Sequence, residues 1–410
     1  MRPLEAAGDE PTLANYLAVM EALADGVAPG DLPALAAFLE GDLSGMRPLP
    51  AYRLLVGTVF RPDLLEEYAS TMLHQTIDRA RAAPTTRAAA LAWGGADVAE
   101  ATIVAFQRTG ANRFLDLFVD YFDEVLRLRD SKLDLRDDRL GVQVPAWGDG
   151  KLVAGRWIAH VTTTARITYA ATAFARLTLP HEWLTAYHAT ARRYVAATER
   201  ALAVFDRDYR RVPGTDATYY RRPTAGHWEP INHAHQVGRV LLNLHALTGE
   251  AEYRRRATQI ADVFAQSVAY DRRGYPYWRF FPYFERERDD ERAELIWKAS
   301  CTMPFVHHAA RRGRIDPAIA DSAARSFVVN LVRDGELNRT VDPARFTALM
   351  RDDENVERAA FTAAWLELAP REPMIFDRVV ELLVAHRNDY FKRGWFGSPS
   401  LARGYAYCLS

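Results

Sequence analysis

The densest group of side chains able to do chemistry lies between residues 219 and 236, which read Tyr-Tyr-Arg-Arg-Pro-Thr-Ala-Gly-His-Trp-Glu-Pro-Ile-Asn-His-Ala-His-Gln. Imidazoles, a carboxylate and amides this close together can move protons near neutral pH and can stabilise a developing negative charge. We take Asn232, His233 and His235 as candidate catalytic residues. The candidate substrate-binding residues beside them are Tyr220, Arg221, Trp228, Glu229 and Gln236.

The spacing of the two histidines limits what they can do together. Pro230 is typical of a first helical turn, so His233 and His235 should lie near the start of a helix, where residues two apart point in different directions. Two histidines at this spacing also make a poor helical zinc pair, and the two cysteines, Cys301 and Cys408, are isolated. We therefore predict no metal and no cofactor. For each histidine alone, a hydrogen-bonded core residue is the simpler interpretation.

A second cluster occupies residues 274–283, Gly-Tyr-Pro-Tyr-Trp-Arg-Phe-Phe-Pro-Tyr. Its two prolines exclude a regular helix, and its flat aromatic faces suit sugar rings or hydrophobic ligands. The alternative is that these aromatic side chains pack into the end of the toroid and bind nothing. Tyr277 and Arg279 are further candidate catalytic residues. The remaining candidate binding residues come from this loop and from four other polar and aromatic segments: Tyr275, Trp278, His160, Lys298, Arg339, Arg403 and Tyr405.

The elements that must position these residues are helices in pairs. Apolar periodicity predicts helices at 88–107 with 113–128, 161–177 with 184–205, 231–247 with 250–268, 291–310 with 317–332, and 356–368 with 374–386. Turns within a pair are short, whereas the links 129–156, 206–230, 269–290 and 333–352 are long, and the tail at 394–407 is predicted as one more loop. Long loops at one end of a rigid scaffold are where function usually lies.

This pattern predicts a single all-α domain over residues 1–410, with N-terminal helices in 1–84 and regular helical hairpins in 85–410. We expect the hairpins to close into an (α/α)6 or (α/α)7 toroid, with the first helix of each pair inside. Additional helices are predicted at 11–24, 32–39 and 64–82. An open solenoid of helix pairs is the alternative fold.

Composition narrows the class of protein. Lys and Arg (52) nearly balance Asp and Glu (53), which argues against a nucleic-acid or anionic-membrane partner. No stretch of the sequence is typical of a membrane span or a secretion signal, so a cytoplasmic location is the expectation. The oligomeric state is left open.

The segments at 228–236 and 275–279 resemble the Asn/His helix head and the Tyr/Arg loop of α/α-toroid carbohydrate enzymes, most closely the uronate-cleaving polysaccharide lyases and more distantly the N-acylglucosamine 2-epimerase family. As architecture the resemblance extends over about 140–407. It implies a carbohydrate substrate and a carbon–oxygen lyase that cleaves uronic-acid glycans by β-elimination without a cofactor.

In that chemistry, Asn232, Arg279 or Arg339 would stabilise the enolate-like charge, His233 or His235 would abstract the proton, and Tyr277 would act as acid or base. We accordingly expect both histidines and Tyr277 to meet in one cavity. A sugar epimerase needs nearly the same residues and is the first alternative; an isoprenoid cyclase and a non-catalytic helical scaffold are the others.

Overall fold

The computed structural model describes residues 62–150, 155–223, 226–285, 293–333, 336–349, 361–385, 399–407 and 409. The helices predicted at 11–24 and 32–39, and Cys408, lie outside the described residues. Within them the chain is helical apart from short hairpins and loops. The main helices are α5 (Pro62–Ala82), α6 (Arg87–Ala90), α7 (Ala96–Thr109), α8 (Arg113–Arg127), α9 (Val161–Thr178), α10 (Thr185–Ala203), α11 (Ile231–Thr248), α12 (Ala251–Ser267), α13 (Ile296–Arg311), α14 (Pro317–Ser326), the 3-10 helix η8 (Phe361–Leu368), α16 (Met374–Ala385) and α18 (Pro399–Tyr407).

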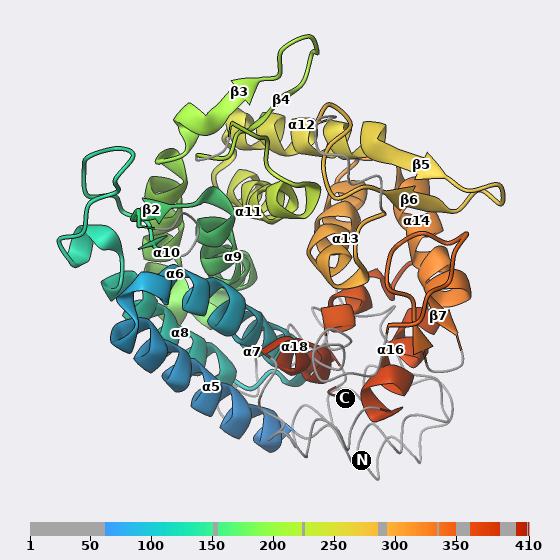
Figure 1. Ribbon diagram of the computed structural model, residues 1–410. Helices are drawn as coiled ribbons and strands as arrows, with labels where there is room; N and C mark the ends of the chain where they lie inside the picture. Colours follow the sequence, from blue (N-terminus) through green and yellow to red (C-terminus); the bar gives the residue numbers. More distant parts are fainter. Residues whose placement is uncertain are drawn as a thin grey trace.

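The helices form a closed ring, which confirms the predicted all-α toroid (Figure 1). Helix α7 packs on α9, α9 on α11, α11 on α13, α13 on η8, η8 on α18, and α18 returns to α7. Six inner elements of the described chain thus surround the axis, as an (α/α)6 toroid requires. Helices α8, α10, α12 and α14 lie outside this inner ring, each directly after its inner partner in sequence (Figure 1).

Short turns join the inner helices to their outer partners, and at two of these turns a glycine stops the inner helix. Gly110 follows α7 with φ 70° and Gly249 follows α11 with φ 76°, the left-handed conformation that glycine adopts without a Cβ clash. The amide of each glycine bonds back to the carbonyl four residues earlier, Phe106 and His245 respectively. The chain therefore reverses within a few residues, as the sequence predicts.

The long links at the opposite end of the pairs each carry a two-stranded antiparallel hairpin. These are β1 (Gly148–Asp149) with β2 (Ile158–Ala159), β3 (Tyr209–Arg211) with β4 (Thr218–Tyr220), β5 (Val268–Tyr270) with β6 (Pro276–Trp278), and β7 (Val332–Arg333) with β8 (Glu336–Leu337). Every hairpin lies between an outer helix and the next inner helix. The starts of α9, α11 and α13 consequently face the same end of the ring as these links, which we call the loop end.

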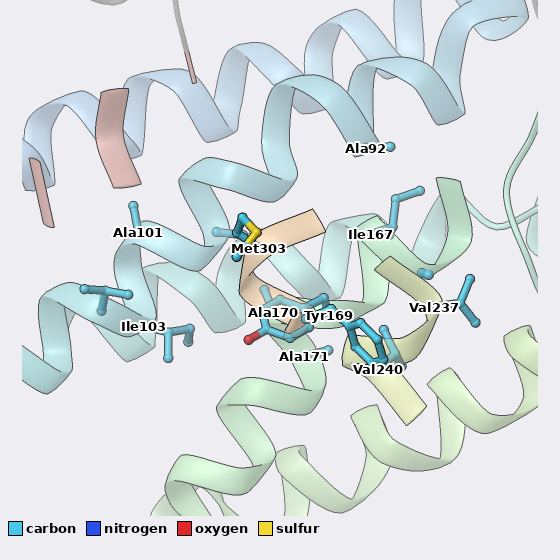
Figure 2. Close-up of a cluster of buried hydrophobic side chains, with 14 of the residues drawn as sticks. Ala92, Ala101, Ile103, Ile167, Tyr169, Ala170, Ala171, Val237, Val240 and Met303 are labelled. Atoms are coloured by element: carbon cyan, nitrogen blue, oxygen red, sulfur yellow. The ribbon is translucent and has the colours of Figure 1, made fainter. Parts of the chain in front are cut away.

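The core lies where the inner helices meet, and small residues let them approach closely. Ala101 of α7, Ala170 and Ala171 of α9, Val237 of α11 and Met303 of α13 are buried in one cluster (Figure 2). A Cβ at Gly238 of α11 would lie 2.4 Å from the Phe305 ring of α13, so this helix contact requires glycine.

Three predicted elements differ from the structure in their start or in their type. The helix predicted at 291–310 begins at Ile296, because residues 293–295 are extended and bridge to neighbouring loops. The described part of the segment at 356–368 is a 3-10 helix rather than an α-helix. The tail predicted as a loop contains α18, whose apolar face closes the ring against α7.

One helical stretch, Pro84–Thr109, is long and apolar enough to cross a membrane, but most of it is buried within the ring.

Candidate functional site

A buried cluster of two histidines and a glutamate lies at the loop end. His160 immediately precedes α9 in an extended conformation, and Glu229 precedes Pro230 at the start of α11. A residue before proline is restricted to extended conformations, which fixes the Glu229 backbone, and its amide donates to the Tyr220 carbonyl at 2.9 Å. His233 lies in the first turn of α11. The proline therefore places a carboxylate beneath two imidazoles from neighbouring inner helices.

The contacts of this cluster define the protonation of His233. Its Nδ1 lies 3.0 Å from Glu229 Oε2, and His160 Nε2 lies 2.8 Å from Glu229 Oε1. An ionised carboxylate can only accept, so Nδ1 of His233 must carry the hydrogen, and in the neutral ring Nε2 then keeps its lone pair. The Glu229 side chain is 0% exposed and that of His160 is 4% exposed, whereas that of His233 is 19% exposed. His233 is thus the member of the cluster that a ligand can reach.

The electrostatics suit a neutral imidazole over an ionised carboxylate. Burial alone would raise the pKa of Glu229, but the charge of His160 and the charge and hydrogen bond of His233 outweigh it and hold that pKa well below its usual value. Burial lowers the pKa of His233; Glu229 opposes this, and the charges of His160 and Arg222 add to it. A neutral His233 hydrogen-bonded to Glu229 is the arrangement of a general base.

Aromatic and cationic side chains surround His233. The rings of Trp93 and Phe280 have centroids 6.5 Å and 6.4 Å from that of His233. The Arg166 guanidinium lies 4.4 Å from the centroid of Trp93, and Lys298 Nζ lies 3.6 Å from the centroid of Phe280. Trp93 is 41% exposed, so part of its ring remains available to a ligand.

Trp93 lies in a π-helical turn, Leu91–Gly95, directly before α7. Such turns insert an extra residue into a helix and are frequent at functional sites. Gly95 closes this turn, where a Cβ would lie 1.9 Å from the Tyr121 hydroxyl. The backbone here is consequently specified by close packing on one side and presents an indole ring on the other.

His160, Glu229 and His233 could also hold a divalent cation, since their ligand atoms lie within 4.8 Å of one another. Although His160 Nε2 and Glu229 Oε1 are close, their contact does not have hydrogen-bond geometry, and both atoms lack hydrogen-bond partners in the described chain. However, tetrahedral zinc ligands stand roughly 3.3 Å apart. The separations of 2.8 Å and 3.0 Å are shorter, so the rings would have to move apart to admit an ion.

Beneath this site, the axis of the ring is filled by buried ion pairs. Arg166 pairs with Asp97 at 3.0 Å and Arg239 pairs with Glu100 at 2.9 Å. Arg239 also lies 3.3 Å from an oxygen of Glu367. The three basic and three acidic members of this network are Arg166, Arg239, Arg403, Asp97, Glu100 and Glu367. Their formal charges cancel, and their burial closes the interior of the ring below the site.

A cavity of about 340 Å³ lies at the other end of the inner helices. Arg176, Arg311 and Arg312 line it, together with the His308 imidazole. These arginines are in or just beyond the last turns of α9 and α13, where positive charge stabilises helix C-termini. The cavity is therefore separate from the His233 site.

His235 is the clearest departure from the sequence-based expectation. It is 0% exposed, its ring packs against Phe264 and Phe305 with centroids 4.9 Å and 4.6 Å away, and its Nδ1 lies 3.2 Å from the Thr302 carbonyl oxygen. Burial lowers its pKa to about 3. His235 is a core histidine, because position 235 points between α12 and α13 while His233 points toward α9.

The aromatic loop does not supply a partner for His233 through Tyr277. In β6, Trp278 points inward, is 2% exposed and donates its indole N–H to Glu294 at 2.6 Å. Strand alternation places Tyr277 on the other face, and no contact found in the described chain joins it to either histidine. Arg279 is exposed and Tyr275 packs beside Arg273 at the hairpin turn. The expectation that Tyr277, His233 and His235 share a cavity is wrong.

Several predicted binding residues prove to be structural. Tyr220 is buried against Tyr209 and its hydroxyl lies 3.5 Å from Arg256 of outer helix α12. Gln236 is buried and donates to the Cys301 carbonyl, which turns it away from a ligand. On α18, Arg403 belongs to the axial ion pairs and Tyr405 is 3% exposed, because these residues are in a helix and not in a loop.

The remaining candidates lie at the loop end. Arg339 is exposed, and its backbone carbonyl accepts from the Ile296 amide at the start of α13. Trp228 packs on Phe284, and the backbone of Trp228 forms an isolated antiparallel β-bridge with that of Arg221. Asn232 is 4% exposed, with an Oδ1 that has no hydrogen-bond partner among the described residues.

Sequence reasoning missed Trp93, Arg222 and Phe280 as neighbours of His233, and treated Glu229 and His160 only as binding residues. The Trp93-Gly94-Gly95 sequence was the available signal, because paired glycines beside an aromatic residue break helical regularity. The pairing of Glu229 with His233 is an i, i+4 spacing that spans the helix start, and the sequence does place both residues on one helix face.

Comparisons with known proteins give matches at the level of structure alone. No family model matches the sequence, and no curated protein matches it. An α-1,6-mannanase of a Salegentibacter species aligns at 10% identity over 84% of this chain and 98% of its own, with a TM-score of 0.49.

Two sugar epimerases also align. One, from a ruminal bacterium, matches at 11% identity over 71% of this chain and 74% of its own, with a TM-score of 0.44. The cellobiose 2-epimerase of Bacillus thermoamylovorans matches at 12% identity over 71% of this chain and 86% of its own, with a TM-score of 0.41. None of these three structures is a polysaccharide lyase, so they give no support to the predicted closeness to that group.

Proposed function

We propose that this chain is a carbohydrate-active enzyme that abstracts the proton next to the carboxylate of a uronic acid, with His233 as the base, and cleaves the glycan by β-elimination. The observation that carries the proposal is the hydrogen bond from His233 Nδ1 to the fully buried Glu229 carboxylate. It orients the ring, leaves Nε2 as the proton acceptor and stabilises the imidazolium that forms.

The surroundings of His233 fit an anionic sugar. The Trp93 ring offers an apolar face for a pyranose, and Lys298 and Arg222 bring positive charge near the imidazole. A uronate carboxylate must be neutralised before the proton on the adjacent carbon becomes acidic enough to remove, and cations are the simplest means. The cytoplasmic location expected from the sequence remains part of this proposal.

The elimination can be written with His233 alone. Its Nε2 takes the C5 proton, the C4–O4 bond breaks as the C4=C5 double bond forms, and the imidazolium returns the proton to O4 on the same face of the sugar. Because Tyr277 does not contact His233, a separate tyrosine acid has no support from the described contacts. This route requires no oxidant and no cofactor.

A sugar epimerase is the second candidate, and the position of Tyr277 is the observation that favours it. Epimerisation requires no acid for a leaving group, so a site in which no described contact joins Tyr277 to His233 suits it. It does require a base on each face of the sugar carbon. His160 is a weak second base because its side chain is 4% exposed and it contacts the same carboxylate as His233.

The test is a screen of uronic-acid oligomers in deuterium oxide. Elimination gives ultraviolet absorbance from the unsaturated product, whereas epimerisation gives deuterium at the reacting carbon without new absorbance. His233→Ala should abolish the signal, and His245→Asn, at the far end of α11, should retain it. Absorbance that persists in His233→Ala would disprove the assignment of the base, and the absence of both signals from every oligomer would refute the proposed function.

A further inference from the structure

A cavity of about 400 Å³ at the loop end is lined mainly by arginine. Five guanidinium groups and one carboxylate come together from two successive long links of the ring. We call this the arginine pocket, and its lining residues are Arg139, Arg207, Asp208, Arg210, Arg221, Arg222, Pro223 and Gly226. Cavities of this size accommodate small ligands such as a single sugar unit.

The arginine pocket has more positive charge than its own residues neutralise. Asp208 is occupied by Arg139, whose Nη1 lies 2.5 Å and 2.6 Å from the two carboxylate oxygens. The contacts found for Arg210 and Arg221 are to the carbonyls of Arg207 and Gly226. Among the described residues, four of the five guanidinium groups in the pocket have no carboxylate partner.

Some of these donors are buried without a hydrogen bond. Arg139 Nε and Nη2 and Arg222 Nε are all buried and have no partner in the described chain. A buried charged donor left unpaired costs free energy, and protein sites of this kind are completed by an anion or by water. Surface arginines that merely extend into solvent would not leave buried nitrogens of this kind.

The pocket and the His233 site share one loop. The Arg222 amide donates to the His227 carbonyl at 2.8 Å, and the Glu229 amide donates to the Tyr220 carbonyl at 2.9 Å. These two bonds hold Arg222 and Glu229 in one paired segment. The charge of Arg222 also reaches the His233 imidazole, whose pKa it lowers. A ligand in one site is thus held by the same segment as a ligand in the other.

We infer that the arginine pocket binds the acidic group of a second sugar unit, a carboxylate or a sulfate, while the unit to be cleaved lies at His233. This inference rests on the proposed function and extends it to the substrate class: an acidic oligosaccharide with a charged group on successive units. Guanidinium groups suit the task because their paired N–H donors match the oxygens of a carboxylate or sulfate.

The test uses the double variant Arg207→Ala/Arg210→Ala, since both side chains are exposed and their removal leaves the packing intact. The charge-matched control is Arg254→Ala/Arg272→Ala, which removes two exposed arginines outside the pocket. Titration calorimetry measures binding of a uronate tetramer, a sulfated tetramer and a neutral tetramer to the full chain. The same variants are assayed for turnover on whichever uronate substrate the screen yields.

We expect the pocket variant to bind one of the acidic tetramers about tenfold more weakly than the wild type, with a smaller dependence on salt, and the control to bind as the wild type does. The acidic tetramer affected identifies the group as carboxylate or sulfate. Equal affinity in the pocket variant and the control, or no binding of either acidic tetramer to the wild type, would overturn the inference. Binding that depends on the pocket without any turnover supports the inference while refuting the proposed function.

Discussion

Replacing Glu229 with glutamine tests the central arrangement most directly. The carboxylate is fully buried and has one imidazole at each oxygen. The amide keeps the size of the side chain but offers one oxygen and one NH2 group. If the NH2 faces His233, Nδ1 must become the acceptor, and the ring hydrogen moves to Nε2, which removes the base. If the oxygen faces His233, the imidazolium formed on proton transfer has no counter charge.

Either orientation should lower turnover by roughly 10² to 10⁴, the range for losing an acid–base group or its orienting carboxylate. This corresponds to about 3–5 kcal/mol in the barrier. The Michaelis constant should change little, because a side chain that is 0% exposed cannot contact the substrate. The assay is the initial rate on the uronate oligomer, read by ultraviolet absorbance or by deuterium incorporation.

The pH dependence of kcat/KM in Glu229→Gln should also shift in a defined direction. Glu229 raises the pKa of His233 against the larger effect of burial. Without the carboxylate, the pKa of His233 should fall further, so the acidic limb of the residual kcat/KM should move to lower pH. A limb that moved to higher pH would contradict a base supported by Glu229.

The chain also offers a matched control. Glu285 accepts from the Trp228 amide at 3.0 Å and lies 3.1 Å from Nδ1 of His227, a second histidine–glutamate pair at the loop end. Glu285→Gln should retain turnover within a few-fold of the wild type. Wild-type turnover in Glu229→Gln, or an equal loss in both variants, would refute the reasoning.

Four further outcomes are expected. Burial raises the pKa of Glu294 to about 8, so the wild type should lose up to roughly 5 kcal/mol of unfolding free energy relative to Glu294→Gln as pH rises from about 4.5 to 8. Urea unfolding of both proteins at the two ends of that range measures the difference, and an unfolding free energy that changes equally with pH in both would contradict the expectation. Arg239→Ala should destabilise the fold by about 3–5 kcal/mol, because Glu100 and its neighbours would lose a buried partner; a thermal midpoint within about 1 °C of the wild type would exclude this. Trp93→Ala should raise the Michaelis constant about tenfold, since stacking on the ring is lost, with kcat nearly unchanged; steady-state kinetics decide, and a fall in kcat alone would argue against a stacking role. Activity should survive exhaustive chelation by EDTA; loss that zinc or manganese restores would instead place an ion at His160 and its partners.

The ring itself could be predicted because its signals are local. Apolar periodicity and turn glycines such as Gly110 and Gly249 act within a few residues, and the lengths of the links distinguish the two ends of the ring. The tail was predicted poorly for a related reason. Helix α18 contains Gly404 and is stabilised by packing on α7, almost 300 residues earlier, and not by its own helix propensity.

The site could be predicted only in part, since its partners are distant in sequence. His233 and Glu229 were identifiable from one segment, but the imidazole of His160 reaches them from 69 residues earlier than Glu229. The choice between His233 and His235 depended on which helix face meets α9, and that is set by packing at Phe264 and Phe305. Residue type alone does not distinguish a core histidine from a base.

The separation of charge along the axis bears on the kind of ligand that the loop end selects. The buried pairs beneath the site neutralise one another, for example Arg166 with Asp97, so they leave no surplus of either sign below His233. The near-neutral composition of the whole chain therefore does not describe its loop end. There Lys298 and the arginine pocket add positive charge to the end of the ring that carries His233. Under the proposed function, a neutral sugar would leave the arginine pocket without an anion, whereas an acidic glycan would supply one and bring its acidic C–H bond to His233.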